Sequence, residues 1–272
     1  ENPLDLLIVG AGISGIDLAH HVNRTFPQWE WEIHDAHDDL GGTWHTFRYP
    51  GIRSDSDMAT FGFPFRPWPH DSTLGGGADI KEYVREVARE AGALDRLHLR
   101  SWVADSDWDS ALQLYRITCQ VGSGSGGGTT ERIVWARRVH YGSGYYSHTE
   151  GYRPSFPGEA DFAGQIIHPQ QWPEDLDYAG RKFVVIGSGA TAVTLLPSLE
   201  KLGAEVTMLQ RTPSYIGPLP EKDTISAVWK RLLPGPLAYR VARFNHGARD
   251  MMQFVVAQRA PWLFTRALRA MQ

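Results

Sequence analysis

The stretch that decides the fold is Leu4-Asp5-Leu6-Leu7-Ile8-Val9-Gly10-Ala11-Gly12-Ile13-Ser14-Gly15. Its apolar run is typical of a buried parallel strand, and the Gly-x-Gly-x-x-Gly turn opens a helical pattern over residues 13–26. A second strand is expected at 29–34, with Asp35 just past its end, where such folds place an acid on ribose hydroxyls. The sequence therefore predicts a dinucleotide-binding unit in which Gly10, Gly12, Gly15 and Asp35 contact the cofactor.

A second turn of this kind is Gly187-Ser188-Gly189-Ala190-Thr191-Ala192. It follows an expected strand at 182–186 and precedes an expected helix at 190–202. After the next strand, at 206–210, come Arg211 and Thr212 instead of an acid. An arginine without a neighbouring carboxylate selects the 2′-phosphate of NADPH over NADH, the alternative being a surface arginine at a strand end. Two dinucleotide turns in one chain indicate a flavoprotein that takes a hydride from a nicotinamide.

Composition excludes several classes of protein. The net charge of −4 gives no reason to expect nucleic-acid binding. The single cysteine, Cys119, excludes a disulfide framework and the cysteine pair that a disulfide-type flavin reductase needs. We expect a reducing, cytoplasmic location, because no signal peptide or membrane-spanning run is visible. The chain begins at Glu1 rather than methionine, so we expect that part of it has been trimmed.

The order of the expected elements predicts an α/β fold with two Rossmann-like units. We assign residues 1–150 to an FAD-binding domain with a β-meander at about 97–139, and residues 151–272 to an incomplete NADPH-binding domain. The Gly/Ser run at 122–128 is interpreted as a hairpin tip rather than a linker. The tail at about 221–272 is helical in pattern and basic, and its periodicity predicts an apolar stripe at Leu237, Val241, Phe244, Ala248, Met251 and Val255. We favour its packing on the NADPH unit over peripheral contact with an anionic membrane.

Two segments without regular periodicity carry further candidates. The run from Gly41 to Asp57 follows Asp35 closely, so we expect it to pass near the first dinucleotide. Its two arginines and two acids fit either a buried ion network or a solvated loop. In the segment 162–173, His168 is a candidate for acid–base chemistry, metal binding or a structural hydrogen bond, and the structural role is favoured because no other His or Cys stands at ligand spacing.

Five residues of this last segment match a long motif, FxGxxxHxxxW followed by Pro or Asp; they are Phe162, Gly164, His168, Trp172 and Pro173. The motif lies between two dinucleotide turns in class B flavin monooxygenases of the Baeyer–Villiger type. Together with the run from Gly41 to Met58 and the segment 168–178, it makes the chain resemble the N-terminal part of this family, within it the ethionamide-activating subgroup.

The resemblance implies FAD on the first unit and NADPH on the second. The positions implied to contact FAD are Ser14, Asp35, Thr43, Trp44, His45, Thr46 and Asp55, with Val103 contributing its backbone, and Ser54 is a further cofactor-binding position. The second turn, from Gly187 to Ala192, would hold NADPH with Arg211 and Thr212. Arg53 would lie near the nicotinamide. The implied catalytic residues are Arg53, Asp55 and His168, and the family's histidine is usually interpreted as a conformational linker.

The resemblance also implies the reaction. NADPH reduces FAD, O2 adds to give a C4a-peroxyflavin, and one oxygen atom passes to a ketone, giving an ester or lactone, or to the sulfur of a sulfide or thioamide. The arginine that stabilises this peroxide is expected beyond residue 272. His45 replaces the family's usual acid, and Ala59 a common tyrosine. The alternative is a non-catalytic FAD- and NADPH-binding fragment, at most an uncoupled NADPH oxidase. No metal is expected.

Overall fold

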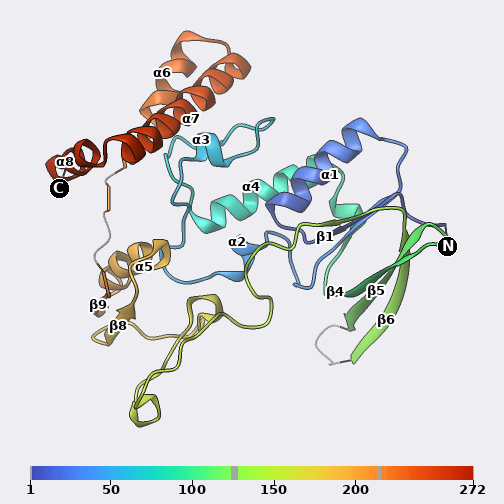
Figure 1. The fold of residues 1–272 in the computed structure, drawn as a ribbon, viewed down its shortest axis with the longest axis horizontal. Helices are drawn as coiled ribbons and strands as arrows, with labels where there is room; N and C mark the ends of the chain where they lie inside the picture. Colours follow the sequence, from blue (N-terminus) through green and yellow to red (C-terminus); the bar gives the residue numbers. More distant parts are fainter. Residues whose placement is uncertain (1, 124–127, 213–215, 218, 272) are drawn as a thin grey trace. The chain divides into compact units, whose positions relative to one another are not determined.

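The computed structural model describes residues 2–123, 128–212, 216–217 and 219–271, which form two compact units (Figure 1). The first unit comprises Glu1–Arg48 and Ala78–Glu174, and the second comprises Tyr49–Gly77 and Asp175–Gln272. By packing, therefore, residues 151–174 group with the first unit and 49–77 with the second. One reason is a pair of backbone hydrogen bonds from Thr73 N to Glu221 O (2.9 Å) and from Asp223 N to Asp71 O (2.9 Å). The division into cofactor domains at 150/151 stays a prediction.

A parallel four-stranded sheet organises the first unit. Its order is β3–β2–β1–β7, with β1 at Leu6–Val9, β2 at Trp31–His34, β3 at Leu97–His98 and β7 at Val139–Tyr141. Two helices accompany it, α1 at Ile13–Thr25 and α4 at Gly77–Glu90 (Figure 1). Successive side chains of β1 face opposite sides, because strand side chains alternate. The predicted strand–turn–helix–strand unit is confirmed.

The predicted meander is present and covers one face of this sheet. Its strands are β4 at Ser101–Asp109, β5 at Leu114–Ser123 and β6 at Gly128–Ala136, all antiparallel. Leu7 of β1 packs with the meander side chains Ile117, Cys119, Val134 and Ala136, which are all buried. The tip of the predicted hairpin, residues 124–127, lies outside the described residues.

Short helices complete the first unit. They are α2 at Thr43–Thr46 and the 3-10 turns η1 at Leu94–Arg96, η3 at Glu159–Asp161 and η4 at Pro169–Gln171.

The second unit contains another strand–turn–helix–strand motif, near the start of its segment 175–272. Strands β8 (Lys182–Ile186) and β9 (Glu205–Leu209) pair in parallel, and α5 (Ala190–Lys201) connects them. The inward side of α5 is buried through Ala192, Thr194, Leu195 and Leu199. These bounds agree with the sequence expectation to within a residue or two.

The tail is helical, as predicted, but a different face of it is buried. It forms α6 (Thr224–Leu232), α7 (Gly235–Arg259) and α8 (Pro261–Met271), and α3 (Met58–Phe61) contacts α7. The apolar stripe expected from periodicity is largely exposed, Phe244 at 75% and Met251 at 63%. Small side chains at Ala238 and Ala242, with His246, form the buried face instead, because they let α7 approach the 57–63 segment closely. Among the described residues, no helix is long and apolar enough to cross a membrane.

Candidate functional site

The first glycine turn forms a bare helix N-terminus at the carboxyl edge of the sheet. Gly10 has a φ of +100°, which favours glycine, and a Cβ there would lie 2.6 Å from the carbonyl oxygen of Gly142. A Cβ on Gly15 would overlap the carbonyl oxygen of Gly10. No side chain caps α1, whose N-cap is Gly12. The first backbone N–H groups of α1 therefore have no intrahelical partner, and such a terminus attracts anions.

Asp35 joins the end of β2 to this turn. Its Oδ2 accepts a hydrogen bond from Ala11 N at 2.7 Å, and its Oδ1 accepts from His37 N and His37 Nδ1, both at 2.9 Å. Burial alone would raise the pKa of Asp35, but these hydrogen bonds lower it below its ordinary value. The same carboxylate raises the pKa of His37. Asp35 is thus held ionised beside the turn, where a carboxylate can accept further hydrogen bonds from hydroxyls.

The predicted residues Thr43, Trp44, His45 and Thr46 form α2, one turn of helix that begins after Gly42. Gly42 lies against Gly12, since a Cβ built on Gly12 would meet Gly42 Cα at 3.5 Å. The structure therefore brings the two glycine-rich segments together, as expected for a segment passing near the first dinucleotide. Thr46 Oγ1 donates to the Gly42 carbonyl at 3.1 Å, which fixes this turn.

His45 occupies the place of the family's usual acid and is nearly buried. Its Nδ1 accepts from Lys81 Nζ at 2.9 Å, and its Nε2 donates to Asp38 Oδ1 at 2.9 Å. Burial, followed by the charge of Lys81, lowers the pKa of His45, so a neutral ring fits both contacts. Nearby, the carboxylate of Asp39 pairs with Lys81 at 2.8 Å and with Arg85 at 2.6 Å.

The sequence did not predict this network of hydrogen bonds and ion pairs around His45, which consists of Asp38, Asp39, Lys81 and Arg85. The available signal was the run Asp35-Ala36-His37-Asp38-Asp39, which puts three acids in five residues, and the two cations four residues apart on α4. Partial burial would raise the pKa of Asp39, but its bonds to Lys81 and Arg85 lower it to about 2. The network anchors the loop that carries α2 to the helix α4.

The lowered pKa of Asp39 predicts how the free energy of unfolding depends on pH. The folded pKa of Asp39 lies below the unfolded value of about 3.9, so ionised Asp39 stabilises the fold above about pH 4, and that contribution is lost as the pH falls toward 2. We expect Asp39→Asn to lower the free energy of unfolding at pH 6 and to differ less from wild type at pH 3. Urea denaturation at both pH values measures this. The exposed Asp95→Asn is the matched control, and an equal deficit at both pH values would contradict the assignment.

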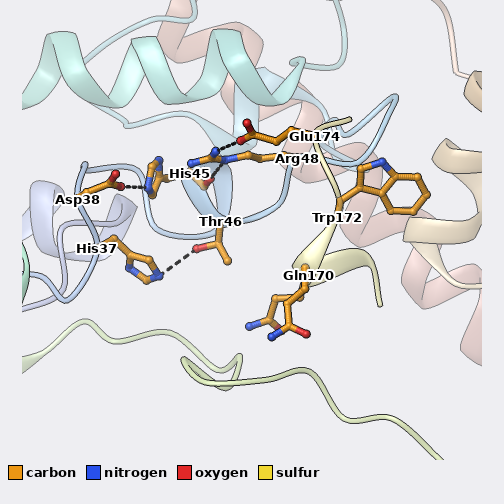
Figure 2. A pocket seen from close by; sticks show the side chains of 9 residues that line it. His37, Asp38, His45, Thr46, Arg48, Gln170, Trp172 and Glu174 are labelled. Carbon is orange, nitrogen blue, oxygen red and sulfur yellow. Dashed lines mark hydrogen bonds and ion pairs between the residues drawn. The ribbon is translucent and has the colours of Figure 1, made fainter. Parts of the chain in front are cut away.

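A cavity of about 290 Å³ opens beside α2 (Figure 2). Its lining includes His37, His45, Thr46 and Arg48 on one side and Gln170, Trp172 and Glu174 on the other. Arg48 Nη1 pairs with Glu174 Oε1 at 2.5 Å, and this contact joins the two sides. The motif segment 162–173 is thereby brought to the loop that follows Asp35, within the first unit.

Two further predicted residues of the first unit have distinct surroundings. Val103 lies on β4 opposite Cys119 of β5, and the register shifts at the next residue, Ala104, which has no partner in the ladder. The predicted backbone contact from Val103 to a ligand stays a prediction. His168 caps η4 by accepting from Gln170 N at 3.2 Å through Nδ1, and its ring lies directly against Gly151. These contacts favour the positioning role for His168, and its catalytic role stays a prediction.

The second turn has the same form in the second unit. Gly187 has a φ of +124°, and Gly189 is the N-cap of α5, which has no side-chain cap. A Cβ on either glycine would meet no atom within 4 Å, so the space over the turn is open. Ile186 pairs with Leu209 in the parallel ladder. Arg211 and Thr212, both exposed, therefore leave the same sheet edge as Gly187, Ser188, Gly189, Ala190 and Thr191.

The remaining predicted residues also belong to the second unit. Arg53 and Asp55 are exposed, whereas Ser54 is buried and accepts from Gly75 N at 2.9 Å. In the described residues, the buried cluster of ionisable side chains in this region is built on Asp57 rather than on the arginines. His246 of α7 lies 3.4 Å from Asp57 Oδ1 through Nδ1 and 3.0 Å from Asp223 Oδ1 through Nε2.

Comparisons with known proteins agree with this geometry. Residues 8–71 match the family described as the NAD(P)-binding Rossmann-like domain. The FAD-containing monooxygenase EthA of Mycolicibacterium smegmatis is 45% identical over 268 residues, covering 98% of this chain and 53% of the relative. The chain thus spans about half the length of the curated relatives it matches.

Solved structures are similar as well. The OTEMO complex with FAD and NADP superposes with a TM-score of 0.66 at 25% identity, covering 80% of this chain and 41% of that one. Closed cyclohexanone monooxygenase gives a TM-score of 0.66 at 27% identity, covering 80% and 40% respectively. The α/β class with its Rossmann-like unit is confirmed.

Proposed function

Since the chain is homologous to FAD-containing monooxygenases over nearly its whole length, we propose that it forms the FAD- and NADPH-binding part of a Baeyer–Villiger-type flavin monooxygenase. The observation that carries the proposal is the pair of uncapped glycine turns, one beside an ionised acid and the other beside an arginine. The proposed reaction transfers one oxygen atom of O2 to a ketone or to the sulfur of a sulfide or thioamide.

The first turn fits FAD. The close approach of Gly12 and Gly42 leaves a cradle without side chains at the N-terminus of α1, suited to a pyrophosphate. Asp35 lies where it can accept hydrogen bonds from the ribose hydroxyls. The segments that border the cradle contribute Ser14, Thr43, Trp44 and Thr46. The backbone of Val103, beside the register shift in β4, would contribute a further contact. Bound there, FAD supplies hydride acceptance and the activation of O2.

The second turn fits NADPH. Open space over Gly187 and Gly189 admits a pyrophosphate, and the N-terminus of α5 offers it unpaired N–H groups. Arg211 and Thr212 stand at the neighbouring strand end, where the 2′-phosphate of the adenosine would lie. We further propose that exposed Arg53 and Asp55 face the reacting ring system and that Ser54 holds their loop through Gly75. The cytoplasmic location stays a prediction.

The Arg211 assignment predicts a change of coenzyme preference. We expect Arg211→Ala to raise the concentration of NADPH needed for half-maximal flavin reduction about 10- to 100-fold, because one charge-assisted contact to phosphate is lost. The value for NADH should stay nearly unchanged. Stopped-flow reduction without oxygen measures both. The matched control is Arg181→Ala, an exposed arginine of the same unit. Equal losses for the two coenzymes would contradict the assignment.

The proposed activity is tested with ¹⁸O2, NADPH and two substrate classes, a cyclic ketone and an alkyl aryl sulfide, using a protein that contains this chain. We expect one ¹⁸O atom in the lactone or sulfoxide and none without NADPH. NADPH oxidation that yields only hydrogen peroxide with every substrate would favour the binding module over the oxygenase.

A further inference from the structure

Three potential metal ligands meet on the sheet face that the meander covers. Glu32 and His34 stand two apart on β2, so they share a face, and His98 of β3 is directly paired with His34. Their ligand atoms, one from each residue, all lie within 4.8 Å of one another. This cluster belongs to neither glycine turn, and the proposed oxygenation does not use it.

The distances within the cluster are close to those of a coordination shell. Glu32 Oε2 lies 3.0 Å from His34 Nε2 and 3.3 Å from His98 Nε2. In a tetrahedral site with bonds of about 2.0–2.1 Å, ligand atoms are roughly 3.3 Å apart. Two edges of such a tetrahedron are therefore already formed. His98 is 39% exposed, and its ring stacks on that of His34 with 4.7 Å between the ring centroids, so closing the third edge requires the exposed His98 ring to rotate.

Glu32 turns its two carboxylate oxygens to different partners, and Oε2 contacts both imidazoles. Arg132 binds the other oxygen, Oε1, at 3.3 Å, which leaves Oε2 facing the imidazoles. Its positive charge opposes a cation and sets a limit on affinity.

A second layer of contacts orients His34, whose side chain is buried. Its Nδ1 lies 2.8 Å from Ser101 Oγ. For His34 to bind a cation through Nε2, the ring proton must lie on Nδ1, where the Ser101 oxygen can accept it, and the ion then replaces the His34 Nε2–H hydrogen bond to Glu32. Such outer hydrogen bonds are a regular feature of metal-binding histidines.

From this juxtaposition we propose that Glu32, His34 and His98 bind one Zn²⁺, with water completing the shell on the exposed side. Two nitrogens and one carboxylate oxygen form a common donor set for zinc. The ion would join β2 to β3 next to Asp35, whose backbone N–H already donates to His98 O at 3.0 Å. The site would thus stabilise the strand end that presents Asp35.

The test is a Zn²⁺ titration of the chelator-treated chain against a chromophoric zinc indicator. We expect one Zn²⁺ per chain, and a loss of at least about tenfold in affinity in Glu32→Gln and His98→Asn. Both positions are partly exposed, so the variants should fold, which circular dichroism checks. The matched controls, Glu30→Gln and His140→Asn, remove an exposed acid and an exposed histidine and should leave affinity unchanged.

Wild-type protein supplies an independent readout, zinc-edge X-ray absorption, in which we expect nitrogen and oxygen neighbours near 2.0–2.1 Å with an imidazole signature. Failure to bind one Zn²⁺ per chain would overturn the proposal. So would binding that Glu32→Gln and His98→Asn leave intact, because the ion would then lie elsewhere.

Discussion

Gly15→Ala is expected to abolish FAD binding and to destabilise the first unit severely. The added Cβ would overlap the backbone carbonyl of Gly10, and it would lie 3.4 Å from Cγ2 of Ile8. The backbone at Gly10 cannot move away, because Gly10 N is hydrogen bonded to His34 O at 2.8 Å and Gly10 itself lies against Gly142. Helix α1 would therefore have to move away from β1, and its N-terminus would leave the place where the pyrophosphate is proposed to bind.

The measurement is FAD retained per chain after gel filtration, together with the urea midpoint of unfolding. The matched control is Gly247→Ala on α7, where a Cβ meets no atom within 4 Å and alanine is the better helix former. We expect the control to keep wild-type flavin content and equal or greater stability. A flavin-loaded, normally stable Gly15→Ala protein would contradict the tight packing of α1 on the turn.

His246→Ala is expected to have the largest effect on stability in the second unit. His246 and Asp57 are almost entirely buried, the side chain of Asp223 is 11% exposed, and the ring lies between the two carboxylates. Without the ring Asp223 loses its hydrogen bond with Nε2 and Asp57 loses its contact with Nδ1, and leaving a buried polar group unsatisfied costs about 1–3 kcal/mol, more for a charged group. Each carboxylate also caps a helix, Asp57 through Thr60 N at 3.0 Å and Asp223 through Ser226 N at 2.9 Å. We therefore expect α3 and α6 to loosen together.

Chemical denaturation measures the free energy of unfolding, and hydrogen exchange at residues 58–61 and 224–232 reports the two helices. The matched control is Phe244→Ala on the same helix, at a side chain that is 75% exposed, which should change stability by less than about 0.5 kcal/mol. If His246→Ala were no more destabilising than Phe244→Ala, the cluster would not hold the helical tail to the 49–77 segment.

Local patterns were enough to predict both strand–turn–helix units and the meander. Apolar runs that end at Gly10 and Gly187 fix where a strand stops and a helix starts, so the bounds of β1, α1, β8 and α5 could be predicted closely. The short distance in sequence after Asp35 also predicted that the run from Gly41 passes near the first turn, although not which of its residues would lie against Gly12. These features depend on neighbours in the chain and on the geometry of one turn.

The rest depends on contacts between distant residues. No local pattern joins Asp57 to His246, so the acids of the 41–57 run could not be assigned a partner. Periodicity favoured the large apolar side chains of α7, yet its buried face has small residues because α7 packs closely through Arg243, whose Nη1 donates to Ala59 O at 2.9 Å. The position of His45 in place of an acid depends on Lys81 and Asp38, which lie on either side of its ring and are distant from it or unmarked by any local pattern.

The central claim is that these residues hold a flavin on the first turn and NADPH on the second. The most direct test is the visible absorption spectrum of the purified chain with FAD, recorded without oxygen before and after NADPH is added. We predict the spectrum of a protein-bound flavin, whose absorbance NADPH bleaches. NADH at the same concentration should bleach it much less. A chain that retains no flavin, or whose bound flavin ignores NADPH, would contradict the account.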